Sequence, residues 1–343
     1  MRAGCPRSQE MKKRNIALGL GGAIGAAMAV KMLARTKTVD WEDVAAEVPN
    51  SEHSHFAAVD GARVHYQEFG EPTHPTLLLI HGYTSSVTAW RTSAPMLAEK
   101  GFHVVAVDLL GFGYSEKPSW FEYSITSQAR IVSRFMNRLG IGRATVVGNS
   151  YGGAVAATLA LDYPERVEKL VLADAVINDD PKNLPILKLA SLPGIGEAIT
   201  PWIVGSKAFW KFRMRNTLAP ANHHLIDDTR VANVRRPLDS ADAHRSLLAT
   251  SRNWSAERIS RDANLISQPT LIVWGEDDKV IPIENGYKLH NDILHSRLVV
   301  LRDCGHIPQE EKSDAFVNIV SEFCRDPKAV FDKLSDEGAL LPA

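Results

Sequence analysis

Short runs of apolar residues recur along the chain, and the segments between them are too long for tight hairpin turns. Each run has the length and composition of a strand that is buried on both faces. The predicted strands cover residues 64–69, 76–80, 104–107, 145–147, 170–173, 271–274 and 298–301. Several intervening segments carry apolar residues at helical spacing, such as Ile131, Phe135 and Leu139. Strands that alternate with helices predict an α/β fold with a mostly parallel sheet flanked by helices.

One long segment interrupts this alternation between residues 173 and 269. Residues 178–262 show a helical and aromatic pattern, including Trp202 and Trp210, and contain no clear strand. Ligands of open parallel sheets bind beyond the carboxyl ends of the strands. We therefore expect this insertion to form a helical cap over such a site.

An apolar run near the N-terminus covers residues 16–34 and contains a single charged residue, Lys31. It is at the short end of what spans a bilayer. Basic residues 12–14 precede it and others follow it, which favours an uncleaved single-pass anchor that holds the protein at a membrane surface. The small-x-small pattern at residues 27–29 leaves open a cleaved signal peptide and export, with Met11 as an alternative start. A soluble N-terminal helix is the third interpretation.

Composition and charge exclude several classes of protein. The 343 residues include 39 Lys and Arg against 40 Asp and Glu, so no nucleic-acid partner is expected. The 3 cysteines are too few and too scattered for a disulfide framework or a structural zinc site. The pair His223 and His224 and the pair His53 and His55 lack Cys or acidic partners at metal-ligand spacing. No metal and no cofactor is therefore predicted.

The strongest local motif is the Gly-Asn-Ser-Tyr-Gly run at residues 148–152, between a predicted strand and a predicted helix. A serine at such a turn projects its hydroxyl away from the backbone, and the glycines let neighbouring chain pass close by. Amides at the start of the helix can stabilise a developing oxyanion. The pattern predicts that Ser150 is a nucleophile. The alternative is an ordinary glycine-rich turn in which Ser150 caps the helix.

A serine hydroxyl needs a base and an orienting acid to act as a nucleophile. His306 follows the predicted strand 298–301 and precedes an acidic, helix-starting segment. An acidic loop that contains Asp277 and Asp278 follows the preceding strand. We expect both loops at the same edge of the sheet as Ser150, where they would complete a catalytic triad.

From about residue 56 to residue 325 the chain resembles the α/β-hydrolase superfamily. The His-Gly pair at residues 81–82 and the Asp-x-x-Gly-x-Gly-x-Ser-x-x-Pro pattern at residues 108–118 match motifs of that family, in the family's order. The resemblance implies that the backbone amides of Tyr83 and Tyr151 form the oxyanion hole.

The resemblance also bears on the acid of the triad. The family's Trp-Gly-x-x-Asp spacing selects Asp278, and Pro282 agrees with the same pattern. Asp277 is then a loop residue or a fallback. Asp174, at the end of the predicted strand 170–173, is a third candidate because some relatives place the acid there.

Ser150 argues against relatives that dehalogenate or open epoxides, because these carry an aspartate nucleophile. The chain is similar to serine carboxylester hydrolases, in particular membrane-associated monoacylglycerol lipases and bacterial lipases. This resemblance implies an esterase or lipase with a small apolar ester as its substrate. The apolar residues of the predicted cap favour a pocket with apolar walls.

Two other functions stay open. Carbon-carbon bond hydrolases of aromatic-ring breakdown share the Gly-Asn-Ser-x-Gly-Gly motif, and Arg213 or Arg215 could correspond to their cap arginine. The chain departs from them after the His-Gly pair, at Tyr83, and after His306, at Ile307. The other alternative is a protein of this fold that binds small molecules and has lost turnover.

These expectations divide the chain into one capped catalytic domain with extensions. The expected parts are a basic segment with an anchor or signal (1–39), a linker or surface helix (40–55), the first part of the core (56–177), the cap (178–262), the second part of the core (263–330) and a C-terminal tail (331–343).

Overall fold

The structure is a computed structural model that describes residues 38–179, 191–327 and 339–340. The predicted anchor or signal at residues 16–34 lies outside the described residues, as does a short part of the expected cap. Within the described ranges, no helix combines the length and the apolar character that crossing a membrane requires.

A nine-stranded sheet with the order β1-β2-β4-β3-β5-β6-β7-β8-β9 forms the core of the described chain. Strands β3 to β8 pair in parallel, whereas β1, β2 and β9 pair antiparallel with their neighbours. The predicted strands are all present, and the predicted α/β fold with a mostly parallel sheet is confirmed. The strands are β1 Ser54–Val59, β2 Ala62–Phe69, β3 Thr76–Ile80, β4 His103–Val107, β5 Ala144–Asn149, β6 Val167–Ala173, β7 Thr270–Gly275, β8 Ser296–Leu301 and β9 Ala339–Leu340.

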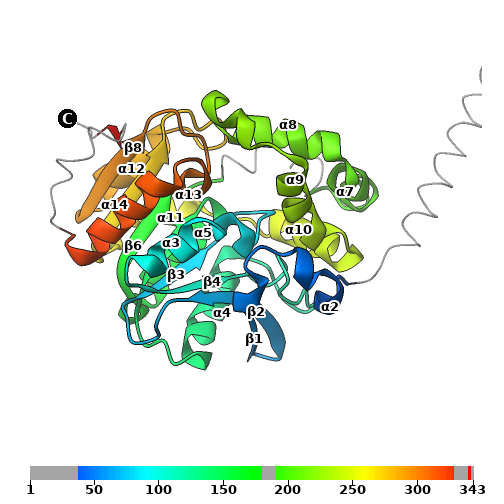
Figure 1. Cartoon of the computed structure of the whole chain (residues 1–343), viewed down its shortest axis with the longest axis horizontal. Coiled ribbons are helices and arrows are strands. Elements are labelled where there is room, and N and C mark those ends of the chain that lie inside the picture. The colour runs from blue at the N-terminus through cyan, green and yellow to red at the C-terminus, as the bar shows by residue number, and fades with distance from the viewer. Residues whose placement is uncertain (1–37, 180–190, 328–338, 341–343) are drawn as a thin grey trace, which may run out of the picture.

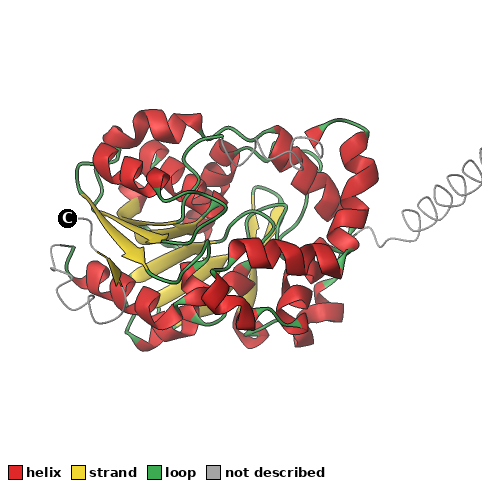
Figure 2. Cartoon of the chain, turned by 90° about the horizontal axis from the view of Figure 1, so that it is seen from above, coloured by secondary structure: helices red, strands yellow, loops and turns green. Residues whose placement is uncertain are grey.

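Helices cover both faces of this sheet (Figures 1 and 2). Leu77 and Leu79 of β3 belong to a buried cluster with α3 and α14, whereas Leu78 and Ile80 belong to a cluster with α4, α5 and α12. Side chains that alternate between two covered faces explain why the strands are continuous apolar runs. The helices are α2 Trp41–Val44, α3 Ser93–Glu99, α4 Ile125–Arg138, α5 Tyr151–Asp162, α7 Ile195–Gly205, α8 Lys207–Thr217, α9 Asp228–Arg235, α10 Ala241–Arg252, α11 Glu257–Asp262, α12 Glu284–Asp292, α13 Pro308–Glu311 and α14 Ser313–Arg325.

Between β6 and β7 the chain leaves the sheet and forms α7, α8, α9 and α10, which lie together at one end of the molecule (Figure 1). Helix α8 contacts both α7 and α9, and α10 contacts α7. The chain then returns to the core through α11, where Ser260 N–H donates to the Ile177 carbonyl at 3.0 Å. The insertion is therefore helical and has its own packing, as a cap requires.

The segment before the core is packed against it. Trp41 of α2 lies 5.5 Å from Phe56, 4.8 Å from His65 and 5.1 Å from Tyr114, measured between ring centroids. Glu47 forms an ion pair with Arg236 of the cap region. Residues 40–55 were expected to form a linker or a surface helix. They contain the short helix α2, and these contacts make the segment part of the folded body.

The sequence pattern missed the first strand. β1 and β2 form a hairpin around Asp60 and Gly61, whose φ angles of 50° and 81° are those of a tight turn with both central residues left-handed. β1 lies at the edge of the sheet and only part of it is buried; its apolar run at residues 56–59 is short and was not assigned to a strand. The expectation that the strands are too far apart for hairpins is therefore wrong for this edge of the sheet.

Replacing Trp41 with alanine tests whether residues 40–55 stabilise the fold. The loss of its aromatic contacts should cost about 2 kcal/mol and lower the melting temperature by about 4 °C. The measurement is thermal unfolding beside Trp120→Ala, since the Trp120 side chain is 61% exposed. Equal melting temperatures for the two variants would mean that the segment contributes nothing.

Candidate active site

Ser150 lies at a sharp turn between β5 and α5. Its backbone has φ 55° and ψ −120°, an unfavourable region for a residue with a side chain. A Cβ atom on Gly148 would lie 2.3 Å from the Gly152 carbonyl oxygen, and one on Gly152 would lie 2.3 Å from the Ile80 carbonyl oxygen. Only glycine fits at these two positions. The Ser150 side chain makes no capping bond to α5, so the alternative of an ordinary helix cap is wrong.

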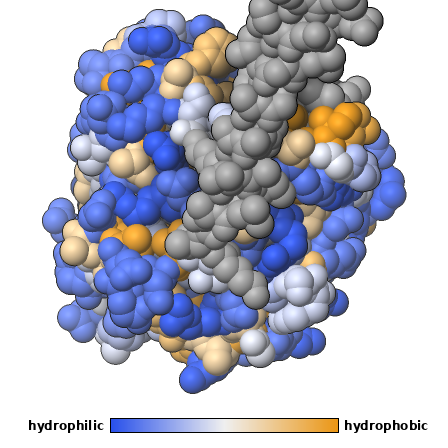
Figure 3. Space-filling model, turned by 90° about the vertical axis from the view of Figure 1, so that its right-hand side faces the viewer, coloured by the Kyte–Doolittle hydropathy of each residue, from blue (hydrophilic) through white to orange (hydrophobic). Residues whose placement is uncertain are grey.

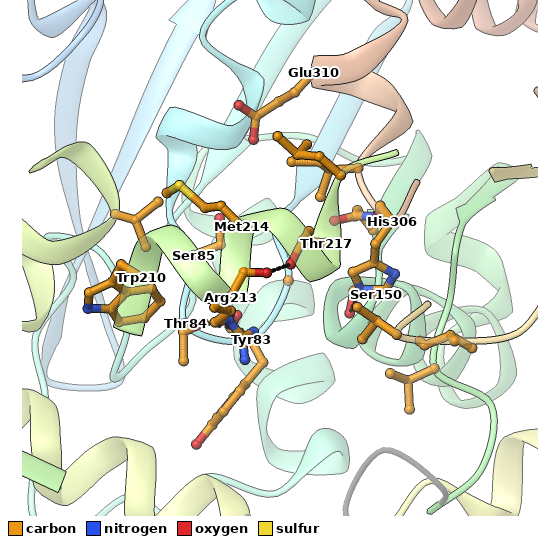
Figure 4. A pocket seen from close by; sticks show the side chains of 18 of the residues that line it. Tyr83, Thr84, Ser85, Ser150, Trp210, Arg213, Met214, Thr217, His306 and Glu310 are labelled. Carbon is orange, nitrogen blue, oxygen red and sulfur yellow. Dashed lines mark hydrogen bonds between the residues drawn. The ribbon is translucent and has the colours of Figure 1, made fainter. Parts of the chain in front are cut away.

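The structure brings Ser150, His306 and Asp278 together (Figure 4 shows the first two). His306 Nε2 lies 2.8 Å from Ser150 Oγ, and His306 Nδ1 lies 2.7 Å from Asp278 Oδ2. A carboxylate only accepts, so Nδ1 carries the proton and Nε2 accepts from the serine hydroxyl. The other oxygen, Asp278 Oδ1, accepts from the amides of Val280 and Ile281 at 2.7 and 3.0 Å. The acid and the base are thus held in the arrangement that activates a serine.

The other two candidate acids have different positions. Asp277 is exposed. Asp174 is fully buried beside Asp278, and its Oδ1 accepts from the Gly275 amide at 2.9 Å. Burial, and then the nearby charge of Asp278, raise the pKa of Asp174 well above its ordinary value. Burial therefore favours the neutral form of Asp174 at the edge of the triad.

Asp174, Asp278 and His306 each bring one potential metal-ligand atom within 4.8 Å of the others. Two of the three residues are already joined by the hydrogen bond of the triad. Burial raises the pKa of the third, Asp174. The hydrogen-bonded pair accounts for this cluster without a metal ion.

The loop after β3 brings the Tyr83 amide to the site. A Cβ atom on Gly82 would lie 3.1 Å from the Ser150 Cβ, so this loop passes directly beside the nucleophile. His81 shapes the loop, because its Nδ1–H donates to the Gly82 carbonyl at 2.8 Å and its Nε2 accepts from the Leu109 amide at 3.1 Å. Burial lowers the pKa of His81, which keeps the ring neutral for these two roles.

Tyr151 is the first residue of α5, so its amide has no acceptor inside the helix. Within the described part of the chain, neither this amide nor that of Tyr83 donates to another residue. Both amides flank Ser150 and are free for an oxyanion. Their role in catalysis stays a prediction.

A pocket opens in front of Ser150 between the core and the cap (Figure 4). Helix α8 contributes Trp210, Arg213 and Met214 to it. Its walls are mostly apolar. The apolar side chains are Val176, Trp210, Met214, Leu218, Val234, Trp254, Val280, Ile281 and Ile307.

Among the charged side chains that line the pocket, the arginines outnumber the single glutamate. Glu310 forms ion pairs with Arg230 and Arg91. Arg213 forms no ion pair within the described ranges; its Nη2 lies 3.4 Å from Thr84 Oγ1 and its guanidinium 5.9 Å from the Trp210 ring. Arg215, the other arginine that the resemblance implicated, is exposed. The pocket therefore contains one cation that no anion of the described chain neutralises.

Several side chains around His306 were not predicted. Asn149 Nδ2 donates to the carbonyls of His306 and Ala173, at 3.1 Å each, and so links the nucleophile's strand to the histidine loop. Glu310 and Glu311 lie in the acidic segment after His306. That position in the sequence is what could have pointed to a role for them. Several of their partners, Arg230, Ala219 and Asn222, come from the insertion between β6 and β7, which no local pattern could identify.

Comparisons with known proteins show the family and the fold. The family model described as alpha/beta hydrolase fold matches residues 75–313. The uncharacterized hydrolase YugF of Bacillus subtilis is 28% identical over 78% of this chain and 96% of its own length. The 2-hydroxymuconate semialdehyde hydrolase of Pseudomonas sp. (strain CF600) is 31% identical over 74% of this chain and 88% of its own length. A solved membrane phospholipase A, described as a novel bacterial virulence factor, has a TM-score of 0.67 and 26% identity, and covers 93% of this chain and 100% of its own.

Amide substitutions at Asp278 and Asp174 test which carboxyl is the acid of the triad. Asp278→Asn should lower kcat by roughly 10³- to 10⁴-fold, because an amide cannot hold the required tautomer of His306. Asp174→Asn should keep kcat within about threefold, because the Asp278 bond to His306 is left in place and asparagine can still accept from the Gly275 amide. The measurement is kcat on a substrate that the wild type turns over. The opposite ranking would assign the acid to Asp174.

The same Asp174→Asn variant tests the protonation of Asp174. The folded protein keeps this group protonated at pH values where the unfolded chain ionises it, so the wild type loses stability as the pH rises above about 4. Asparagine does not ionise. The melting temperature of the variant relative to the wild type should therefore rise between pH 4 and pH 7. A difference that is constant with pH would show that Asp174 is ionised in the folded protein.

Proposed function

The chain belongs to the alpha/beta hydrolase fold family, and on this premise we propose that this hydrolase cleaves carboxylic esters through an acyl-enzyme on Ser150. The observation that carries the proposal is the unbroken series of hydrogen bonds from Ser150 Oγ through His306 to Asp278, at 2.8 and 2.7 Å. This arrangement serves nucleophilic attack on a carbonyl carbon.

In the proposed reaction, His306 Nε2 takes the proton of Ser150 as Oγ bonds to the ester carbonyl carbon. The negative charge moves to the carbonyl oxygen, which the amides of Tyr83 and Tyr151 stabilise. His306 then gives its proton to the leaving alcohol, and the acyl-enzyme forms. A water molecule, deprotonated by the same histidine, releases the acid and restores Ser150. Asp278 stabilises the imidazolium in both halves.

The pocket walls favour an apolar acyl chain. Trp210, Met214 and Trp254 lie with other apolar side chains around the cavity in front of Ser150. Burial of methylene groups against such walls contributes about 0.8 kcal/mol for each group. The similarity to a phospholipase over 93% of the chain supports a lipid-derived ester as the substrate class.

We further propose that the protein acts at a membrane surface. The apolar run at residues 16–34 supports it. Large apolar side chains are also exposed on the cap, among them Ile195, Trp202 and Phe212 at 42%, 40% and 63%. Figure 3 shows the end of the molecule that carries the cap helices: apolar groups lie there within a mostly hydrophilic surface. Such side chains suit contact with lipid.

A second candidate is a carbon-carbon bond hydrolase, and one specific observation favours it. Arg213 is a cation in the pocket without an ion-pair partner in the described chain, and a carboxylate on the substrate would supply one. The similarity to a 2-hydroxymuconate semialdehyde hydrolase agrees with this chemistry. The same serine, histidine and oxyanion hole can serve both reactions.

A fluorophosphonate probe and p-nitrophenyl esters of increasing acyl length test the ester proposal. Wild-type protein should be labelled and should turn over esters, with longer chains preferred because the pocket is apolar. Ser150→Ala should abolish labelling and lower kcat by about 10⁴-fold or more. Labelling without ester turnover would favour the second candidate, and no labelling of folded protein would indicate a binding protein without catalysis.

Arg213→Met distinguishes the two substrate classes. Methionine keeps an apolar side chain of similar length, so kcat/KM for a neutral p-nitrophenyl ester should stay within about threefold or rise. For 2-hydroxymuconate semialdehyde, loss of a charge-assisted bond should lower kcat/KM by about 10- to 100-fold. Arg215→Met, on the exposed side of the same helix, is the matched control. Equal losses for both substrates would remove Arg213 from the recognition of anionic groups.

A further inference from the structure

Glu311 collects hydrogen bonds from the loop that carries His306. Its Oε1 accepts from the amide of Gly305 at 3.0 Å and from the amide of Ile307 at 3.3 Å. These two residues flank His306 in the chain. One carboxylate oxygen thus holds the backbone on both sides of the histidine, although Glu311 contacts no atom of its ring.

The other carboxylate oxygen of Glu311 accepts hydrogen bonds from the cap side. Oε2 accepts from the amide of Ala219 at 2.8 Å and from the side-chain amide of Asn222 at 2.9 Å. Ala219 and Asn222 lie in the segment that follows α8. The single side chain of Glu311 therefore joins the histidine loop to the segment that continues from the cap helix lining the pocket.

Further contacts show how closely the two segments meet. The His306 amide donates to the Thr217 carbonyl at 2.8 Å, and Asn222 Nδ2 also donates to the Asp303 carbonyl at 2.8 Å. A Cβ atom on Gly305 would lie 2.4 Å from the Thr217 carbonyl oxygen and 2.7 Å from the Ala219 nitrogen. The backbone of one segment lies directly on the other, so a shift of the cap segment displaces the histidine loop.

The four bonds require a carboxylate. All four partners are N–H donors, and an ionised carboxylate offers acceptors only. A glutamine of the same shape would turn an NH₂ group toward two of these donors. Glu311 is 8% exposed, and it forms no ion pair within the described residues. Burial raises the pKa of Glu311, and the hydrogen bonds from Asn222, Ala219, Gly305 and Ile307 act against that rise.

We propose that Glu311 is a positioning residue that makes the alignment of His306 depend on the seated cap, through its bonds to Gly305, Ile307, Ala219 and Asn222. The inference rests on the proposed serine hydrolase reaction. When the cap segment is seated, the donors on both sides are satisfied and His306 lies against Ser150. When the segment moves away, Oε2 loses both donors and the histidine loop loses the support of Thr217.

Glu311→Gln is the direct test. It should lower kcat for a short p-nitrophenyl ester by about 10- to 100-fold, since a displacement of about 1 Å at a catalytic group has this effect. KM should stay within about twofold, because Glu311 does not line the pocket. The NMR resonance of the proton between His306 Nδ1 and Asp278 should shift or broaden. Hydrogen exchange should accelerate at the amides of Gly305, Ile307 and Ala219.

Two further variants complete the design. Asn222→Ala removes the bonds of Asn222 Nδ2 to Glu311 and to the Asp303 carbonyl, and leaves Glu311 itself in place. It should accelerate exchange at Ala219 more than at Gly305 and lower kcat by less than Glu311→Gln does. It also tests the proposal if Glu311→Gln does not fold. Glu257→Gln, an exposed position, is the control for loss of one glutamate charge and should match the wild type.

The outcomes separate this inference from the proposed function. Wild-type kcat, an unchanged His306 resonance and unchanged exchange in folded Glu311→Gln would overturn the role of Glu311. For Asn222→Ala, the overturning result is exchange at Ala219 equal to that of the wild type. If wild-type protein shows no ester turnover, the reaction is wrong, but resonance and exchange still report on whether Glu311 positions the histidine loop.

Discussion

The strained backbone of Ser150 is the constraint on which the site depends. A left-handed residue with a side chain costs about 1–3 kcal/mol, so its surroundings must hold it. They do so through the Ser150 amide, which donates to the Ala173 carbonyl at 3.0 Å, and through the Ser150 carbonyl, which accepts from the Val176 amide at 3.0 Å. The close approach of Gly152 to Ile80 sets the helix against the neighbouring strand. Sheet, turn and helix thus fix the direction of one hydroxyl group.

The parallel sheet supplies the partners of that hydroxyl. Because β5, β6, β7 and β8 are consecutive neighbours and all parallel, the loops that follow them meet at one edge. Ser150 follows β5, Asp174 follows β6, Asp278 lies beyond β7 and His306 beyond β8. The spacing of the sheet then brings residues far apart in sequence within hydrogen-bond distance. The cap closes the remaining side, and the pocket is lined by side chains of both the cap and the core.

The parallel sheet also explains which features could be predicted from the sequence. Buried parallel strands are continuous apolar runs, so β3 to β8 could be predicted, whereas the partly buried edge strand β1 was missed. Ser150 stands in a local motif and His306 follows a strand, so both were identifiable. The Trp-Gly-x-x-Asp spacing favoured Asp278 by resemblance, but Asp174 stayed open, because only the structure shows which carboxyl bonds to His306 Nδ1. Asn149 and Glu311 act through backbone groups of other segments, and such contacts exist only once the cap and core are packed.

The charged groups around His306 can be understood together from the charges that the proposed reaction creates. Asp278 Oδ2 lies next to His306 Nδ1, and Glu311 accepts from the amides on either side of His306 in the chain. Arg213 lines the pocket. In the proposed reaction, His306 becomes a cation when it takes the serine proton, and a negative charge forms on the substrate at the same time. Asp278 then stabilises the first charge, and the predicted oxyanion-hole amides stabilise the second. Asp174 lies beside the Asp278–His306 pair, and its burial, followed by the nearby charge of Asp278, raises its pKa. The burial that isolates the triad from water therefore disfavours a further anion at this place.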